Sequence, residues 1–377
     1  MFNNSCSLIA IFILLTLKSY ASENPKDETF RVGLANLYFF ANLIENNVKN
    51  PPFKKPHKNP PDEQIEKEFD RLSLEYLSRY IRYLDADVLI LCEAPSNLSQ
   101  LEEFVSTYLD SDFDVIHNSP VVRDKTYYYD QQIAALVRKN LFKIRRYEAL
   151  SQDSVEDLNQ LYPYPSSSSV QIPSSSSVQM AGETMTVYWS RFPIEFDLAL
   201  KTDSEHWYKI IATYPKSKAS KGKLDAVKAR LKNFEQQRLI RSRIESVSQS
   251  FEDIIILGDM NDSLGMDPVE KELGIDSLMA LFKGDQDPIL WNPIKFPQGE
   301  GTYIYKNNPE VIDFIFLTHG LKLGKGWTSE KQYEYFHFFK TMVRQKLPAK
   351  PDRLEHRELF ISDHAPVTID INHNRRK

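Results

Sequence analysis

The chain has little cysteine, no excess of basic residues and no long apolar run. Only Cys6 and Cys92 occur among its 377 residues, which excludes a scaffold held together by several disulfides. Lys and Arg number 47 against 52 for Asp and Glu, and this net charge of −5 excludes a nucleic-acid coat protein that is basic throughout. The 41% of hydrophobic and 12% of aromatic residues are enough to bury a sizeable core. We therefore expect a folded globular protein whose contacts with any polyanion are local.

The amino terminus carries one short apolar run, residues 8–17. About ten residues are too few to cross a bilayer, which takes roughly 20. They match the apolar part of a secretory signal, and the small residues Ser19 and Ala21 precede a cleavage point. We predict that residues 1–21 are a signal peptide and that the protein is secreted, to the periplasm or the medium. A buried first helix or an uncleaved anchor is the alternative, because no Lys or Arg precedes the run.

Short apolar runs rich in Val, Ile and Phe recur along the chain, and each ends on polar residues. They cover residues 30–37, 87–91, 133–137, 208–213, 253–257, 311–317 and 366–371. Near-continuous apolar runs of this length indicate strands that are buried on both faces. Residues 62–84 and 224–246 instead repeat apolar side chains at nearly helical spacing. The pattern predicts an α/β fold in which two packed sheets are flanked by helices.

Two stretches interrupt this pattern. Residues 163–181 contain Pro-Ser-Ser-Ser-Ser-Val-Gln twice, a low-complexity repeat that can bury little and is expected to form a surface loop. Residues 322–359 form a long aromatic and basic connection, either a binding loop or a helix packed on the sheet through its rings. We expect a single domain over residues 29–373 that contains both insertions.

Polar residues that a plain core would not need stand at or near the ends of the apolar runs. They are Asn36, Glu93, Asp259, Asn261, Asp313, Asp363 and His364. Singly, each has an ordinary explanation, because Gly-Asp-x-Asn-Asp is good turn chemistry, Ser-Asp can cap a turn and an acid at a strand end is usually solvated. Their value as a signal depends on their occurring together and in this order.

Together, these motifs resemble the endonuclease/exonuclease/phosphatase superfamily, which includes deoxyribonucleases, abasic-site endonucleases, sphingomyelinases and inositol-polyphosphate phosphatases. The strongest are Gly-Asp-Met-Asn-Asp at 258–262, Ile-Asp-Phe-Ile-Phe at 312–316 and Ser-Asp-His-Ala-Pro-Val at 362–367. Weaker agreement comes from Gln-Ile-Ala-Ala-Leu-Val-Arg at 132–138, Ser-Arg-Phe-Pro at 190–193 and Thr-Tyr-Pro-Lys-Ser at 213–217. The resemblance spans residues 31–371. It implies a four-layer α/β sandwich with its active site at one edge of the two sheets.

The resemblance also implies catalytic roles in phosphodiester hydrolysis, which needs an activated water, neutralised phosphoryl oxygens and help for the leaving group. His364 would be the general base, and Asp313 would hold its imidazole in one tautomer. Asp259 would position or activate the water. Asn261 would donate a hydrogen bond to the phosphoryl group.

A divalent cation is implied as well. Glu93 would bind it, with Asn36 and Asp363 completing the metal and phosphate environment. Mg²⁺ suits such hard oxygen ligands best, and Mn²⁺ is possible. The sequence shows no Cys/His cluster of the kind that binds zinc.

Tyr214 departs from the commonest family pattern, in which a His at this position aids the leaving group. Abasic-site endonucleases carry a Tyr there, so the resemblance still implies a catalytic role. A phenol can donate a hydrogen bond to a phosphate oxygen, but it is a poorer proton shuttle than imidazole at neutral pH. Arg191, Lys216 and Lys218 lie in or just after the weaker motifs and are expected to bind substrate phosphates, with a solvated loop as the alternative for the lysines.

The leading hypothesis is a secreted, metal-dependent phosphodiesterase that hydrolyses nucleic acid as an endonuclease or exonuclease. A phospholipid headgroup of the sphingomyelin type or an inositol phosphate is the alternative substrate, because one scaffold hosts all of these activities. A catalytically inactive binding protein on the same fold is the third possibility. No obligate protein partner is evident from the sequence, and a monomer is expected.

Overall fold

The computed structural model describes residues 29–37, 63–95, 98–117, 132–146, 169–171, 184–186, 191–282, 290–296, 301–305, 308–324 and 364–373. The predicted signal peptide and most of both predicted insertions lie outside these residues. Inside the Ser-rich stretch 163–181, β6 (Ser169–Gln171) pairs with β7 (Thr184–Thr186). The first two residues of the stretch 322–359 form β15 (Lys322–Leu323), which pairs with β16 (Val367–Asn372).

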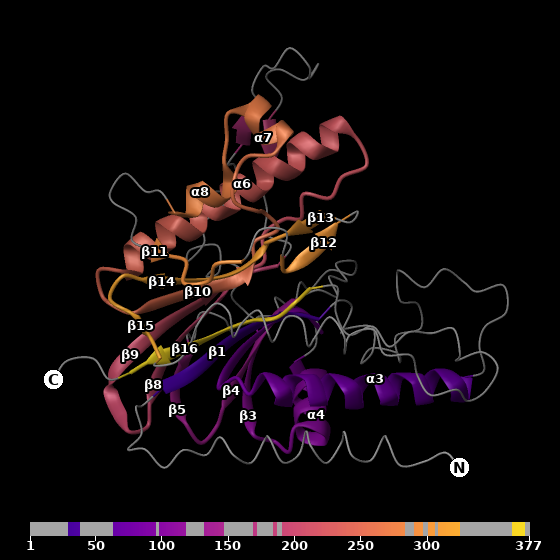
Figure 1. Ribbon diagram of the computed structural model, residues 1–377, viewed down its shortest axis with the longest axis vertical. Coiled ribbons are helices and arrows are strands. Elements are labelled where there is room, and N and C mark those ends of the chain that lie inside the picture. Colours follow the sequence, from indigo (N-terminus) through magenta and orange to yellow (C-terminus); the bar gives the residue numbers. More distant parts are fainter. Residues whose placement is uncertain are drawn as a thin grey trace, which may run out of the picture.

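Two mixed six-stranded sheets form the centre of the molecule. The first has the order β15, β16 (Val367–Asn372), β1 (Thr29–Asn36), β2 (Val88–Ala94), β4 (Gln132–Arg138) and β3 (Phe113–His117). The second has the order β11 (Leu290–Trp291), β14 (Asp313–Thr318), β10 (Ile254–Asp259), β9 (Asp203–Ala212), β8 (Ile194–Leu200) and β5 (Phe142–Arg146). The two sheets face each other across one apolar core that draws side chains from both (Figure 1).

Helices cover the two outer faces. On the first sheet these are α3 (Glu63–Leu84) and α4 (Leu98–Tyr108), and on the second α6 (Lys223–Val247) and α8 (Ser277–Phe282) (Figure 1). The short helix α7 (Pro268–Leu273) packs against α6. The described chain is therefore a single α/β domain with four layers, helices, sheet, sheet, helices. This confirms the predicted fold class.

Strand β10 shows why the apolar runs are continuous. Ile255 and Leu257 point into the core between the sheets, whereas Ile254 and Ile256 lie beneath α6 and α8. Because both faces of the strand are buried, neither set of alternate positions can be polar. The seven predicted runs correspond to β1, β2, β4, β9, β10, β14 and β16, and the two predicted helices correspond to α3 and α6.

The topology brings the polar strand ends to one edge. β1 and β2 are parallel, so Asn36 and Glu93 both lie towards their carboxyl ends. β14 runs antiparallel to β10 in a register that sets Asp313 opposite Asp259. A small hairpin of β12 (Tyr303–Tyr305) and β13 (Asn308–Glu310) reaches the same edge, through an isolated bridge between Tyr303 and His364. Within the described part of the chain, no helix combines the length and apolar character needed to cross a membrane.

Candidate active site

A buried Asp–His pair lies at this edge. Nδ1 of His364 is 2.7 Å from Oδ2 of Asp313, and the two residues are 8% and 1% exposed. The backbone of Asp313 is fixed in turn, because Thr302 Oγ1 accepts its N–H at 3.1 Å. The backbone carbonyl of Thr302 accepts the N–H of Ala365 at 2.7 Å, and the ring of Tyr303 lies 4.8 Å from the imidazole, centroid to centroid. A carboxylate on Nδ1 selects the tautomer in which the other ring nitrogen can act as a base.

Asp259 lies beside this pair. Its two oxygens accept hydrogen bonds from the carboxamide of Asn36 at 2.9 Å and from the backbone N–H of Asn261 at 2.9 Å. Burial, reinforced by the nearby charge of Asp313, raises the pKa of Asp259, while His364 and the two hydrogen bonds oppose the rise. The carboxyl of Asp259 is thus held in a buried, low-dielectric setting at the end of β10.

The backbone of the site is tightly constrained. A Cβ on Gly258 would lie 1.8 Å from the carbonyl oxygen of Thr213, so only glycine lets β10 pass the end of β9 here. Glu93 and Asn261 have φ angles of +63° and +51°, in the left-handed region that costs free energy for residues other than glycine. Glu93 also sits at a β-bulge between Cys92 and Ala94. Two of the predicted site residues therefore occupy strained positions, which is common at functional sites.

Tyr214 connects Glu93 to a buried arginine. The phenol hydroxyl donates a hydrogen bond to Oε1 of Glu93 at 2.8 Å, and the guanidinium of Arg191 lies 3.5 Å over the ring. Burial raises the pKa of Tyr214 well above its ordinary value, so this phenol stays protonated and serves as a donor. Its hydroxyl hydrogen is directed at the carboxylate of Glu93. The role predicted for Tyr214 towards a substrate phosphate stays a prediction.

The residues present fit a divalent cation. Asp259, Asp313 and His364 each offer one ligand atom within 4.8 Å of the others, and all three are buried. In the described part of the chain, Oδ1 of Asp313 is a buried oxygen with no hydrogen-bond partner. A buried carboxylate oxygen of this kind is a suitable ligand for a hard cation such as Mg²⁺ or Mn²⁺. Glu93 and Asn36 add further oxygens at the same edge.

The predicted phosphate-binding residues differ in their surroundings. Arg191 is buried and donates to the carbonyl of Pro215 at 3.4 Å, and the carboxamide of Asn261 donates to the same carbonyl at 3.1 Å. Lys216 follows directly and is half-buried. Lys218 instead forms ion pairs with Asp262 and with Glu270, the latter at 2.8 Å. Its ammonium group is therefore part of a buried ion cluster.

The structure thus brings most of the predicted site residues together. Asn36, Glu93, Tyr214, Asp259, Asn261, Asp313 and His364 meet at one edge, and Arg191 and Lys216 border it. Asp363 lies outside the described residues. Thr302 and Tyr303 were not predicted from the sequence, although the Gly-Thr-Tyr-Ile-Tyr segment before the Asp313 strand carries the alternating pattern of a short hairpin strand.

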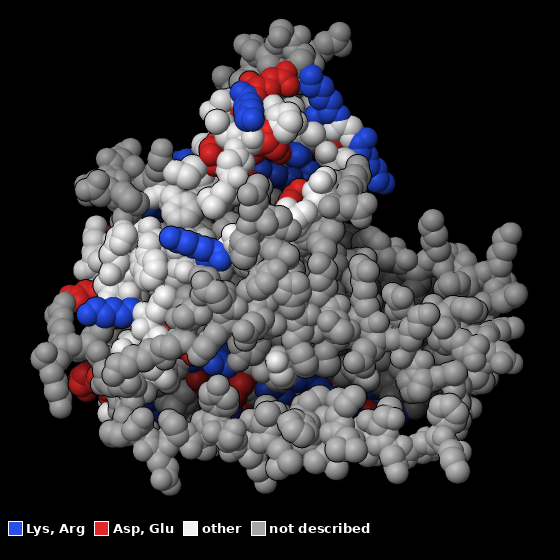
Figure 2. Space-filling view, viewed as in Figure 1, with Lys and Arg blue, Asp and Glu red and all other residues white. Residues whose placement is uncertain are grey.

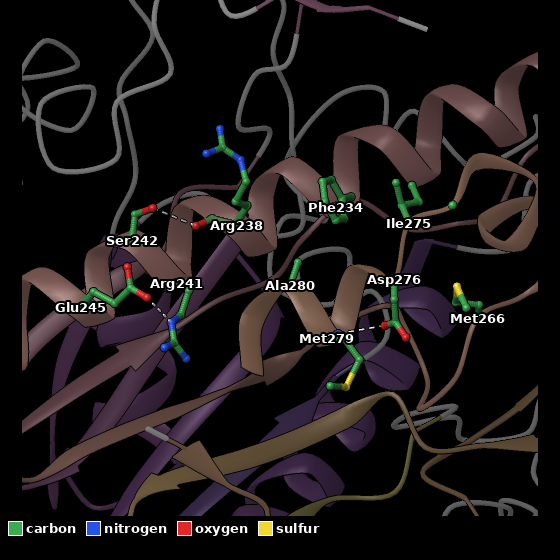
Figure 3. A pocket seen from close by; sticks show the side chains of 11 residues that line it. Phe234, Arg238, Arg241, Ser242, Glu245, Met266, Ile275, Asp276, Met279 and Ala280 are labelled. Atoms are coloured by element: carbon green, nitrogen blue, oxygen red, sulfur yellow. Dashed lines mark hydrogen bonds and ion pairs between the residues drawn. The ribbon is translucent and has the colours of Figure 1, made fainter. Parts of the chain in front are cut away.

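A pocket of about 660 Å³ lies elsewhere, between α6 and the segment that includes α8 (Figure 3). Phe234, Ile275 and Met279 line it together with charged residues such as Arg241 and Glu245. None of the predicted site residues lines this pocket. It is therefore separate from the edge at which the Asp–His pair lies.

The chain was compared with known proteins. No family model and no curated protein sequence matches it. Solved structures with similarity over 91% of this chain include an endonuclease/exonuclease/phosphatase family protein from Bacteroides thetaiotaomicron, at 12% identity over 97% of that chain with a TM-score of 0.47. ANGEL2, a 2′,3′-cyclic phosphatase in complex with adenosine-2′,3′-vanadate, matches at 16% identity over 95% of that chain with a TM-score of 0.48.

A mannosyl-6-phosphatase from Bacteroides thetaiotaomicron matches over 91% of this chain and 99% of its own, at 15% identity and a TM-score of 0.45. One of these structures is named as a member of the superfamily that the sequence motifs resemble.

Proposed function

We propose that this chain is a metal-dependent phosphodiesterase that hydrolyses nucleic acid. The observation that carries the proposal is the buried pair of Asp313 and His364, 2.7 Å apart, with Asp259 and Asn261 beside it at one edge of the sheets. A fixed imidazole next to two carboxylates is suited to activating water, and nearby amide donors are suited to a phosphoryl group.

In the proposed mechanism His364 takes a proton from the attacking water at Nε2, because Nδ1 is engaged by Asp313. Asp313 stabilises the imidazolium that results and keeps the ring oriented. Asp259 holds the water in line with the phosphorus, and Asn261 donates a hydrogen bond to a phosphoryl oxygen. Glu93, Asn36, Asp259 and Asp313 would hold Mg²⁺ at this edge. When bound, the cation would neutralise charge on the phosphoryl oxygens. Tyr214 holds the carboxylate of Glu93 in place.

A nucleic-acid substrate is favoured by the basic residues that continue from this edge. Lys216 borders the site, and Lys221 and Lys223 are exposed on the connection into α6 and at its start. Figure 2 shows Lys and Arg side chains at the upper end of the molecule, over α7 and the start of α6, with Asp and Glu side chains between them. A local row of cations lets a protein of net charge −5 hold a polyanion.

Secretion is part of the proposal. It is supported by the apolar run at residues 8–17 and the small residues that follow it, which have the length and order of a secretory signal. Amino-terminal sequencing of the protein recovered from the medium or the periplasm tests this. We expect the mature chain to begin near Ser22.

The experiment that tests the activity is a substrate panel. Mature protein is incubated with plasmid DNA, single-stranded DNA, RNA, sphingomyelin and an inositol phosphate, in Mg²⁺ and in excess chelator. We expect hydrolysis of a nucleic acid in Mg²⁺, none in chelator, and recovery when Mg²⁺ or Mn²⁺ is restored. Hydrolysis of only the lipid or the inositol phosphate would assign the alternative substrate class. Full turnover in chelator, with metal content checked, would overturn the metal-dependent mechanism.

A further inference from the structure

Helix α6 carries carboxamide side chains on the face that it buries. Asn233, Gln236 and Gln237 are at most 1% exposed, at positions where a helix that covers a sheet ordinarily has apolar residues. Burying a carboxamide costs free energy unless its polar groups are hydrogen-bonded. Each of the three side chains binds the backbone of a loop at the catalytic edge. This shared direction indicates that the helix supports those loops.

Asn233 connects the two loops to each other. Its carboxamide nitrogen donates to the carbonyl of Lys216, after β9, at 2.9 Å and to the carbonyl of Met260, after β10, at 3.0 Å. Gln237 also donates to the Met260 carbonyl, at a longer 3.4 Å. Oδ1 of Asn233 is buried and has no hydrogen-bond partner in the part of the chain that the structure describes. The side chain is therefore fixed by the hydrogen bonds that it donates, one to each loop.

The bond to Met260 fixes the peptide unit that leads into Asn261. The carbonyl of Met260 and the backbone N–H of Asn261 belong to one planar unit. Asn233 binds this unit at its carbonyl, and Oδ1 of Asp259 accepts its N–H at 2.9 Å. The φ angle of Asn261 is +51°, a conformation that a residue other than glycine keeps only where its surroundings enforce it. The two hydrogen bonds oppose relaxation of the loop out of this conformation.

The side chain of Asn261 is held through the other loop. Its carboxamide donates to the carbonyl of Pro215 at 3.1 Å. The N–H of the same peptide unit, which belongs to Lys216, donates to Oε1 of Gln236 at 2.6 Å. Because Asn233 binds the carbonyl of Lys216, α6 holds the backbone on both sides of Lys216. Both ends of Asn261 are thus anchored to the same turn of α6.

We propose that Asn233 is a positioning residue that sets the carboxamide of Asn261 for the phosphoryl group. The inference rests on the proposed function, in which Asn261 donates a hydrogen bond to a phosphoryl oxygen. Such a donor stabilises a transition state only when it is preorganised where the charge develops, and a displacement of about 1 Å can cost roughly 100-fold in rate. Asn233 is fully buried, so it acts through Asn261 rather than on the substrate itself.

The first experiment measures the hold on Asn261 without catalysis. Hydrogen exchange of the backbone N–H of Asn261 is followed by NMR in wild type, in Asn233→Asp and in a control, Ile244→Val. Asn233→Asp keeps the shape of the side chain and replaces its donating NH2 group by an oxygen. Ile244→Val removes one buried methyl group about three turns further along α6. The N–H of Ile256, inside β10, reports changes in overall stability.

We expect exchange at Asn261 to be at least about tenfold faster in Asn233→Asp, with a smaller change at Ile256, and to be unchanged in Ile244→Val. If Asn233→Asp does not fold, Asn233→Ala takes its place, because it removes the same donors without placing an acid in the interior. Unchanged exchange at Asn261, or equal acceleration at Asn261 and Ile256, would overturn the proposal.

The second experiment is a double-mutant cycle in kcat on the best substrate of the panel. We expect Asn233→Asp to lower kcat about tenfold with KM nearly unchanged, and Ile244→Val to behave like wild type. In the background of Asn261→Ala, adding Asn233→Asp should change kcat by less than about twofold, because the group that it positions is gone. The same tenfold loss in both backgrounds would show a general structural role and overturn the proposal.

The two experiments separate this inference from the proposed function. If no substrate of the panel is hydrolysed and exchange at Asn261 is faster in Asn233→Asp, the proposed function fails and the hold of Asn233 on Asn261 stands. If nucleic acid is hydrolysed and exchange at Asn261 does not respond to Asn233→Asp, the positioning role fails and the proposed function stands.

Discussion

The imidazole of His364 is oriented by side chains from two other elements. Asp313, the first residue of β14, binds Nδ1, and Tyr303 from the β12 hairpin packs against the ring at 4.8 Å. The hairpin also supports Asp313, through the hydroxyl of Thr302. A general base works only when its free nitrogen is held towards the water it deprotonates. The hairpin is therefore part of what makes the Asp–His pair functional.

This arrangement predicts that Tyr303 is a positioning residue. Tyr303→Ala should lower kcat about tenfold and leave KM nearly unchanged, because a loosened imidazole loses alignment while substrate contacts remain. Tyr303→Phe keeps the ring and should retain near wild-type turnover. Steady-state kinetics on the best substrate checks both. A rise in KM with unchanged kcat would show that the ring binds substrate instead.

Tyr214 gives the second prediction at this scale. Tyr214→Phe removes the hydroxyl that donates to Glu93 and leaves a buried carboxylate without that donor. We expect turnover to fall by about 10- to 1,000-fold, as for loss of one well-placed donor at a reacting centre. We also expect the Mg²⁺ concentration for half-maximal activity to change several-fold. Unchanged turnover with an unchanged Mg²⁺ requirement would make Tyr214 a packing residue only.

At the scale of elements, the segment after β10 is held by a buried ion cluster. Lys218 pairs with Asp262 and Glu270, and Arg230 pairs with Asp267 at 2.9 Å. Asp267 also caps α7, where its side chain accepts the backbone N–H groups of Val269 and Glu270. The loop that carries Asp259 and Asn261 is thus tied to α7 and to the connection before α6.

Lys218→Met should therefore act on stability more than on substrate binding. Removing the cation leaves Asp262 and Glu270 buried beside each other, which typically costs about 3–5 kcal/mol. Urea unfolding of Lys218→Met against Lys221→Met, an exposed lysine in the same connection, checks this. If Lys218→Met unfolded like wild type and only its KM rose, the lysine would be the substrate contact that its motif suggested.

The same elements explain what could be predicted from the sequence. Strands such as β10 and β14 were predictable because both faces are apolar. β8 was not, because Glu195 and Asp197 interrupt its apolar residues. Both acids are buried against Lys209 of β9, and Arg243 of α6 also pairs with Glu195 at 2.7 Å. Such a strand depends on partners far away in the sequence, which no local pattern reveals.

The candidate site was predictable where its residues lie at the first or last position of a strand. Asn36, Asp259 and Asp313 follow or begin apolar runs, so the topology brings them to one edge. Tyr303 acts on His364 through a contact that spans 61 residues of chain, which no local sequence pattern reveals. Its role required the structure.

At the scale of the whole molecule, Lys232 makes stability depend on pH. Its pKa is about 7 in the folded protein, below the ordinary lysine value, so between these two pH values the unfolded chain binds a proton that the folded chain does not. The destabilisation that Lys232 causes is greatest below pH 7 and disappears as the pH rises towards 10.5. Lys232→Met should thus be more stable than wild type at pH 6, by a few kcal/mol.

Urea unfolding in phosphate-free buffer from pH 6 to 9.5 measures this difference. It should shrink as the pH rises, and Lys228→Met, a control on the same helix, should show no such trend. If the difference in the free energy of unfolding between Lys232→Met and wild type stayed constant from pH 6 to 9.5, folding would not disfavour the charged form of Lys232, and the prediction would be wrong.

The most direct test of the account is the turnover of His364→Ala on the best substrate of the panel. With an unchanged melting temperature, the rate should fall by about 100- to 10,000-fold or more, because the general base is gone. Asp313→Asn should fall in the same direction, since its carboxamide no longer holds the imidazole in the reactive tautomer. His319→Ala, an exposed histidine just after β14, should keep wild-type turnover. Near wild-type turnover by His364→Ala would contradict the central claim that the buried Asp–His pair performs the hydrolysis.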